Sequence, residues 1–270
     1  MWLKVFSITL IIICLTLPGS ACSSDTDGQL KNTNIQLQQK VQLELDALDR
    51  DVSAASSGLA ATGLSGDEAR KILEGVCSNR SYLVTASTTD TAGKMVTIAP
   101  DAYRSYEGTD ISKQDAVIKF ERDKKPLLSQ VFRAVEGFDG VVLMWPIISD
   151  KTGYIGSVSV LFKPEALVSS VAGSAIKNSG LEVMALQPDG LIVYGSEGTE
   201  TGKNLFKDPM YKDYTELLLL GSRFTSDASG SGNYTFPAHE SGQLVKKLAV
   251  WCSAGLHGTD WRLVSIKSPD

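Results

Sequence analysis

The sequence has little of what most catalytic and metal-binding sites require. It contains 2 histidines, His239 and His257, and both lie in loop contexts next to proline or glycine. It has no G-x-S-x-G, HExxH, C-x-x-C or phosphate-loop motif, and no Cys/His/carboxylate cluster with metal-ligand spacing. Ser253, His257 and Asp260 follow one another, but their spacing gives no reason to expect a catalytic triad. We therefore expect no enzyme, no metal site and no cofactor.

Excess positive charge is also missing. Lysine and arginine number 26 against 31 aspartates and glutamates, which gives a formal net charge of −5. Proteins that bind nucleic acid usually present a basic face. The composition therefore argues against a nucleic-acid partner, and no block of like charge indicates a polyelectrolyte tail.

Long apolar runs are absent except near the N-terminus. The run from Val5 to Leu17 follows Lys4 and is shorter than the ~20 residues of a membrane span, but it suits a signal-peptide core. Small residues and Cys22 come next, as in a lipoprotein signal, although Gly19 stands where such signals usually carry leucine. We expect export, with a lipid anchor at Cys22 holding the protein to the outer face of the cytoplasmic membrane. Simple cleavage with secretion, or an uncleaved anchor, are the alternatives.

Cysteine is scarce as well. Of the 4 cysteines, Cys22, Cys77 and Cys252 remain after residues 1–21 are removed. With Cys22 lipidated, the other two form the one possible intramolecular pair, which an oxidising compartment permits. Two cysteines in a chain of this length make no disulfide framework, so we favour two separate small buried residues.

Apolar spacing predicts a long N-terminal helix over residues 30–61, after a short tether at 23–28. Its apolar residues recur at intervals of three, four and seven. They are Leu30, Leu37, Val41, Leu45, Leu48, Val52, Ala55 and Leu59. This stripe is suited to packing along a neighbouring domain or to pairing with a second copy in a homodimer. Gly63 and Gly66 end the helix, and a second helix follows to Val76.

Two downstream stretches share one plan: two strands, a helix, then three strands. The first has strands at 82–87 and 95–98, a helix at 113–122, and strands near 129–135, 141–148 and 154–162. The second has strands at 181–186 and 191–194, a helix at 209–220, and strands at 232–236, 244–251 and 261–266. A helix over 164–177 joins them, and the loop 108–111 is echoed at 202–205. This order is typical of an α+β, PAS-like module built on an antiparallel sheet.

The chain resembles the double Cache sensor family over about residues 30–266, and most of all the freestanding Cache proteins of methanogenic archaea. The residues that carry the likeness are AVEGFDG (134–140), Trp145-Pro146, GYIGSVSVLFKPE (153–165), LQPDGLIVYGSEGTETGKNLFKDPMY (186–211), SGSGNYTF (229–236) and AVWCSAGLHGTDWRLVSI (249–266). The resemblance implies a long N-terminal helix followed by two PAS-like modules. The expected parts are a signal peptide at 1–22, tether and helices at 23–76, a membrane-distal ligand-binding module at 77–165, a linking helix at 166–180 and a membrane-proximal module at 181–270.

The resemblance also bears on the ligand. In amino-acid-binding members, an Arg-x-Trp-Tyr run holds the ligand carboxylate and an aspartate on the last strand holds its amine. Here the corresponding segments read Lys125-Pro126-Leu127-Leu128 and Val160-Leu161-Phe162. Lys125 supplies a point charge without the planar fork of arginine. A small carboxylate is therefore favoured over an amino acid.

Eight residues of the first module are candidate ligand contacts. They are Tyr103, Arg104, Tyr106, Lys125, Ser129, Trp145, Ser157 and Ser159. Ser157 and Ser159 share one face because side chains alternate along a strand. Most candidates also have a structural interpretation: solvated surface for the first four, core packing for Trp145 and close helix contact for the two strand serines. Ser129 is expected to donate a hydrogen bond to a ligand.

The sequence shows no output domain, so we expect a small-molecule sensor that signals through a partner, such as a membrane receptor or a transporter subunit. The alternative is a surface interaction or adhesion protein that keeps the fold without a ligand. A cavity with convergent polar groups in residues 77–165 would favour the sensor. A filled core beside a broad exposed apolar patch would favour the interaction protein.

Overall fold

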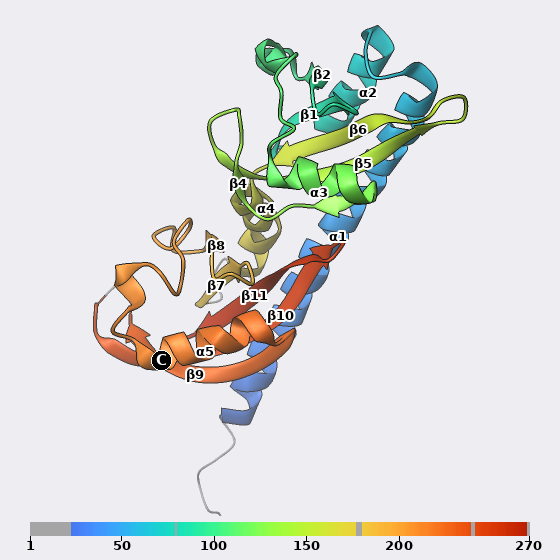
Figure 1. Cartoon of the computed structure of the whole chain (residues 1–270). Helices are drawn as coiled ribbons and strands as arrows, with labels where there is room; N and C mark the ends of the chain where they lie inside the picture. Colours follow the sequence, from blue (N-terminus) through green and yellow to red (C-terminus); the bar gives the residue numbers. More distant parts are fainter. Residues whose placement is uncertain (1–22, 79, 177–179, 239–240, 269–270) are drawn as a thin grey trace, which may run out of the picture.

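The computed structural model describes residues 23–78, 80–176, 180–238 and 241–268. Two antiparallel sheets lie one beyond the other along a single long helix, α1 (Figure 1). This is the α+β architecture predicted from the sequence. The expected signal peptide and Cys22 lie outside the described residues.

Helix α1 (Ser23–Thr62) packs against both sheets. All eight residues of its predicted apolar stripe are buried, from Leu30 to Leu59. The stripe therefore contacts strands β5 and β6 of the first sheet and β10 and β11 of the second, and it is not available to a second copy of the chain. The helix already includes residues 23–28, so the predicted tether is wrong. An acidic residue near this end, Asp27, favours helix there, because a negative charge interacts well with the N-terminal end of the helix dipole.

Helix α2 (Asp67–Cys77) returns beside α1 and packs on strands β1 and β2. The turn between the helices needs two glycines, because Gly63 and Gly66 have φ angles of 89° and 94°. A side chain other than glycine is strained in that region. The glycines therefore set where α1 ends, as the sequence predicted.

The first sheet has the strand order β2-β1-β6-β5-β3, with β4 also pairing β5. The module built on this sheet contains β1 (Leu83–Asp90), β2 (Met95–Ala99), η1 (Asp101–Tyr106), α3 (Asp115–Asp123), β3 (Leu127–Leu128), β4 (Phe132–Arg133), β5 (Asp139–Ser149) and β6 (Gly153–Phe162). The single strand predicted near 129–135 is wrong. The Ser129 hydroxyl accepts the Val142 N–H at 3.0 Å, which takes the place of a backbone bond and divides the strand into β3 and β4.

The second sheet has the corresponding order β8-β7-β11-β10-β9 and follows helix α4 (Pro164–Ile176). The module built on this sheet contains β7 (Leu181–Leu186), β8 (Ile192–Gly195), η2 (Pro209–Tyr211), α5 (Thr215–Ser226), β9 (Ser229–Pro237), β10 (Leu244–Leu256) and β11 (Thr259–Lys267). The helix predicted over 209–220 is divided into η2 and α5, because Tyr214 between them has non-helical angles (φ −104°, ψ 74°). Helix α5 then continues beyond the predicted end.

The echo between the loops 108–111 and 202–205 corresponds to one repeated hydrogen-bond pattern. The Gly108 N–H donates to the Met95 carbonyl, and the Gly202 N–H donates to the Ile192 carbonyl, both at 2.8 Å. In each module the strand residue returns a bond through its own N–H to the next loop residue. The two modules are therefore repeats at the level of backbone contacts, which supports the repeat predicted from the sequence.

The two cysteines are free thiols in different modules. Cys77 lies at the end of α2, and Cys252 lies on β10, where its thiol donates to Asn34 Oδ1 of α1 at 2.9 Å. Burial raises the pKa of each thiol to about 11. Two separate, partly buried cysteines were favoured by the sequence, and the structure agrees.

Candidate functional site

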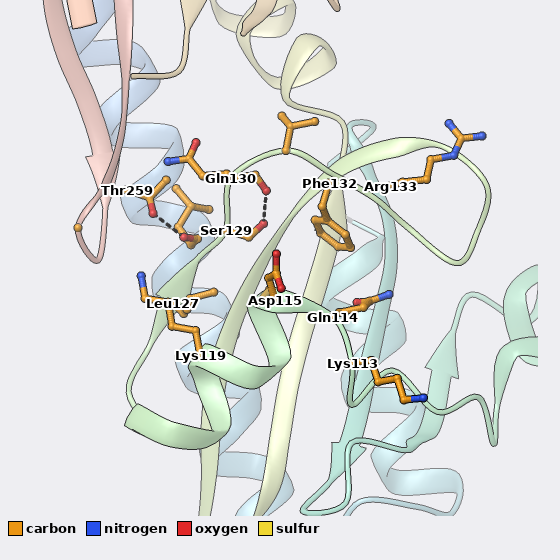
Figure 2. Close-up of a pocket in the computed structure, with 14 residues that line it drawn as sticks. Lys113, Gln114, Asp115, Lys119, Leu127, Ser129, Gln130, Phe132, Arg133 and Thr259 are labelled. Carbon is orange, nitrogen blue, oxygen red and sulfur yellow. Dashed lines mark hydrogen bonds between the residues drawn. The ribbon is translucent and has the colours of Figure 1, made fainter. Parts of the chain in front are cut away.

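A cavity of about 560 Å³ lies beside α3 in the first module. Figure 2 shows the first turns of α3 on one side and the segment from β3 to β4, residues 127–133, on the other. The turn between β10 and β11 contributes Gly258 and Thr259, so the second module forms part of the wall. The volume falls within the range of about 300–1,000 Å³ that small-molecule sites occupy. We call this space the basic cavity.

The charges around the basic cavity are mainly positive. Lys113 of the turn before α3, Lys119 of α3 and Arg133 of β4 line it, against a single carboxylate, Asp115. Figure 2 shows the Asp115 side chain pointing toward the β3–β4 segment. Arg133 also forms an exposed ion pair with Asp139 at 3.3 Å. A ligand with a carboxylate would therefore meet an attractive field, and Asp115 offers one acceptor for a ligand hydrogen-bond donor.

Ser129, a predicted contact, lines the basic cavity but has both of its hydrogen bonds satisfied within the chain. Its hydroxyl donates to the Gln130 carbonyl at 2.7 Å and accepts the Val142 N–H at 3.0 Å. The side chain is 7% exposed. Ser129 therefore fixes the backbone of the cavity wall and has no spare donor for a ligand.

Thr259 is a contact that the sequence reasoning missed. Its hydroxyl donates to the Leu128 carbonyl at 2.7 Å, so it joins the second module to the wall of the cavity (Figure 2). A threonine in a Gly-flanked hairpin turn carries no sequence signal for a contact with a strand 131 positions away. Only the packing of the two modules along α1 brings them together.

Ser157 and Ser159 lie on the α3-facing side of β6, as predicted, beside two hydroxyls of β1. The register pairs Ser159 with Ser87 and Ser157 with Thr89. The four residues, here called the hydroxyl row, are all buried. The Ser87 and Ser159 hydroxyls are 3.1 Å apart. Thr89 Oγ1 and Ser157 Oγ have no hydrogen-bond partner among the described residues.

The hydroxyl row lies close to the basic cavity but is not part of its lining. Leu127 lines the cavity and pairs with Met144 of β5, and Met144 pairs with Ser159 of β6. Since neighbouring strands are ~4.8 Å apart, the row begins ~10 Å from the cavity wall. At the other end of this face, Thr85 donates to Glu136 at 3.4 Å, and burial raises the pKa of that carboxyl. An anionic ligand group is therefore better placed in the cavity than over the row.

The other charged and aromatic candidates lie outside the basic cavity. Tyr103, Arg104 and Tyr106 belong to η1, where the two tyrosine rings stack at 6.3 Å. The Arg104 side chain is 61% exposed and faces Asp101 and Glu107 at 3.9 and 3.8 Å. Lys125 is exposed and does not line the cavity. The structure does not bring these four residues together with Ser129.

Trp145 lies on the opposite side of the first sheet, toward α1. Since side chains alternate along β5, Met144 faces α3 and its neighbour Trp145 cannot. Trp145 Nε1 donates to Asp49 at 2.7 Å, and His257 Nε2 lies 2.7 Å from the same carboxylate oxygen. The edge of one ring meets the other, with centroids 6.1 Å apart. Trp145 therefore belongs to the junction of α1 with the two modules, in agreement with its core interpretation and not with a cavity wall.

Neither a metal cluster nor a membrane-spanning helix is found in the described part of the chain. No group of three or more His, Cys, Asp or Glu there is arranged to hold a metal ion. None of the helices described combines the length and the apolar content that crossing a membrane requires.

Part of the chain matches a known family of sensor domains. Residues 43–164, which hold the second half of α1 and all the strands of the first sheet, match the family model described as HK/GC/Chemotaxis protein-like, sensor domain. The similarity concerns this part of the chain. No curated protein sequence matches the chain.

Among solved structures, the chain is similar to ligand-binding domains of receptors. An extracellular ligand binding receptor from Desulfohalobium retbaense is 33% identical, with a TM-score of 0.75 over 88% of this chain and 40% of that protein. This chain therefore spans less than half of that relative. The ligand-binding domain of the Pseudomonas fluorescens chemoreceptor CtaA, solved with L-isoleucine, is 15% identical, with a TM-score of 0.65 over 93% of this chain and 95% of that one.

A third structure has the same fold. The ligand-binding domain of the Pseudomonas aeruginosa amino acid chemoreceptor PctB, solved with L-arginine, is 15% identical. The match has a TM-score of 0.63 over 92% of this chain and 97% of that one. The chain is similar to all three in architecture, and to the Desulfohalobium receptor also in sequence.

Proposed function

We infer that the chain is an extracytoplasmic sensor protein that binds a small carboxylate-bearing molecule in the basic cavity of its first module. The observation that carries this inference is the cavity itself, with Lys113, Lys119 and Arg133 against one carboxylate. The chemoreceptor domains CtaA and PctB were solved with L-isoleucine and L-arginine, and both ligands carry a carboxylate. The sequence predicted a carboxylate ligand on the basis of Lys125. In this proposal Lys113, Lys119 and Arg133 bind the carboxylate in its place.

The signal would leave the first module through its contact with the second. Thr259 of the second module bonds to Leu128 in the cavity wall, so movement of the 127–133 segment changes an inter-module contact. A ligand shifts such an equilibrium only by its differential affinity for the two states. The proposal therefore includes a membrane receptor or transporter subunit that registers the change.

The proposal also covers the location of the protein and the roles of its parts. The protein would be exported, held at the outer face of the cytoplasmic membrane by lipid on Cys22, and related to the freestanding Cache proteins of methanogens. Residues 77–165 would be the membrane-distal, ligand-binding module, 166–180 the linking helix and 181–270 the membrane-proximal module. The rival interaction protein is less favoured, because the first module has a polar cavity where a filled core would be expected.

A thermal-shift titration tests the proposal. Purified protein is heated with small carboxylates, amino acids, amines and nucleobases, and a ligand at 100 times its Kd should add about 2.7 kcal/mol to the free energy of unfolding. Lys119→Gln should abolish the shift given by a carboxylate. Lys125→Gln is the matched control, since it removes the same charge from the same module outside the cavity. A flat response to every class, or equal effects of the two variants, would contradict the proposed site.

A further inference from the structure

A second cavity, of about 310 Å³, lies in the second module and has a different chemistry. Glu182 of β7, Glu197 and Glu200 of the loop after β8, and Lys247 of β10 contribute its charges. Aromatic rings from the start of α5 and from β9 form its apolar wall. We call it the acidic cavity. Nothing in the proposed carboxylate site requires it.

Lys247 does not balance the charge of the acidic cavity. Its side chain is 3% exposed, and its ammonium group lies 2.7 Å from both oxygens of Glu182. This bidentate contact pairs one cation with one carboxylate, so it does not neutralise Glu200. No ion pair connects Glu200 to another residue of the described chain, although its carboxylate lines the cavity.

Glu200 lies where an added cation would be stabilised. Burial is the main cause that raises the pKa of its carboxyl, and the charges of Glu182 and Glu197 raise it further, against Lys247 and Lys203. Burial of a carboxylate without a partner is costly, and a cationic ligand group would relieve that cost. The aromatic rings that line the same cavity, Tyr214 and Phe236, are also suited to a cation.

The aromatic wall is built around Phe236. Its ring centroid is 4.6 Å from that of Tyr214 and 6.1 Å from that of Tyr211. The Lys247 ammonium already lies 5.8 Å from the Phe236 ring centroid, so this wall accepts positive charge. The Tyr211 hydroxyl is buried and has no hydrogen-bond partner among the described residues.

We propose that the acidic cavity binds a small organic amine, with its ammonium group at Glu200 and its carbon atoms against Tyr214 and Phe236. The volume is at the lower end of the range for ligand sites, which limits the amine to a small one. A divalent metal is the poorer occupant, because the carboxylates of the described chain form no group that could hold one. The first module would then respond to an anionic group and the second to a cationic one.

Calorimetric titration of the purified protein at pH 8 with 1,4-diaminobutane, with choline and, separately, with calcium chloride tests the assignment. One saturable site is expected for at least one of the two amines. Glu200→Gln should weaken binding about tenfold or more, since it removes a charged hydrogen-bond acceptor. Glu74→Gln is the control: it changes the net charge equally, from an exposed position on α2 in the first module. Its affinity for the amine should equal that of the unmodified protein.

The pH dependence of amine binding and a second variant, Tyr214→Leu, test the proposed roles of the carboxylate and of the aromatic wall separately. Because the pKa of Glu200 is raised, amine affinity should fall as the pH drops through that pKa, and Glu200→Gln should remove this dependence. Tyr214→Leu should weaken choline more than it weakens the diamine. The absence of any amine binding, an unchanged affinity in Glu200→Gln, or calcium binding lost in that variant would each overturn the proposal. Lys119→Gln should leave amine binding intact, so failure of the carboxylate site and failure of this one are distinguishable.

Discussion

The two modules share a strand order and a loop pattern but differ in the sheet face that their helices cover. The turn after the first strand of each module shows which positions correspond. The Asp90 N–H donates to the Lys94 carbonyl in the first module, and the Gln187 N–H donates to the Leu191 carbonyl in the second, so Asp90 corresponds to Gln187. In the first module these positions hold Ser87, Thr89, Ser159 and Met144, and in the second they hold Met184, Leu186, Val264 and Trp251. The fourth member of the row, Ser157, corresponds to the buried Arg262, which pairs with Leu186. The fold therefore tolerates either a row of hydroxyls or a mainly apolar face at the same place.

The difference indicates a division of roles. In the second module, Trp251 is 1% exposed and meets Phe224 edge-on with centroids 5.0 Å apart, so this face is filled. In the first module, two buried hydroxyls lack partners among the described residues, and a cavity opens next to the same helix. Apolar burial stabilises a module, whereas unpaired buried hydroxyls cost stability. The face that α5 covers is therefore the more firmly packed of the two, although the second module has its own unpaired buried groups elsewhere, Tyr211 Oη and Trp261 Nε1.

Truncating the two equivalent large side chains should separate the modules most strongly. Trp251→Ala should lower the free energy of unfolding by about 3–5 kcal/mol, because it leaves a large cavity in a filled core. Met144→Ala should cost about 2 kcal/mol, near the lower end for methionine, because one of its two strand partners is the small Ser159. Urea denaturation of both variants measures the two losses. Equal losses would show that the face of the first module is as firmly packed as that of the second.

Adjacent threonines on β1 test the unpaired hydroxyls. Thr88 faces α1 and donates to the Leu64 carbonyl at 2.7 Å, while accepting the Thr97 N–H at 3.1 Å. Thr88→Val should therefore cost about 1–3 kcal/mol. Thr89 is in the hydroxyl row and its hydroxyl has no partner within the described residues, so Thr89→Val should change stability by less than about 0.5 kcal/mol or increase it.

The same urea experiment compares the two threonine variants. A loss for Thr89→Val as large as that for Thr88→Val would mean that the row is fully satisfied in solution. The row would then not differ in kind from the filled face of the second module.

The architecture could be predicted well from the sequence, because the spacing of apolar and polar residues repeats with the period of a helix or a strand. The α1 stripe from Leu30 to Leu59 and the shared face of Ser157 and Ser159 both follow from spacing alone. The position of Trp145 did not, because alternation gives two faces without saying which one meets α3 and which meets α1.

The basic cavity was less predictable than the fold. Its wall combines α3, the 127–133 segment and Thr259, which lie far apart in the sequence and meet only through the packing of both modules on α1. Lys125 was favoured by the resemblance to the family pattern, yet Lys113 of the preceding turn and Lys119 of α3 line the cavity. Which lysine near α3 lines the cavity depends on how the helix is rotated about its axis. The residue type alone does not determine that rotation.

Two glutamates, one in each module, should respond to pH with opposite signs. Burial opposes ionisation of Glu107, but the hydrogen bonds from Arg70 at 2.6 Å and from the Ile98 N–H at 3.1 Å outweigh it and lower its pKa. Its contribution is therefore present above the unfolded pKa of about 4.3 and lost as the pH falls through the lower folded value. Glu107→Gln should cost about 1–2 kcal/mol at pH 7, with a smaller loss in acid.

Glu200 reverses this dependence, because burial raises its pKa. The folded protein then binds the proton more tightly than the unfolded chain, so its penalty grows as the pH rises above about 4.3 and is complete above the folded pKa. Glu200→Gln should add about 0.5–2 kcal/mol at pH 7 and nothing at pH 3.5, within the range of typical stabilising substitutions. Urea midpoints of both variants at the two pH values decide the matter. If Glu200→Gln instead destabilised the protein at pH 7, a cation from the chain itself would already occupy the acidic cavity, and the contrast between the modules would lie in their sheet faces alone.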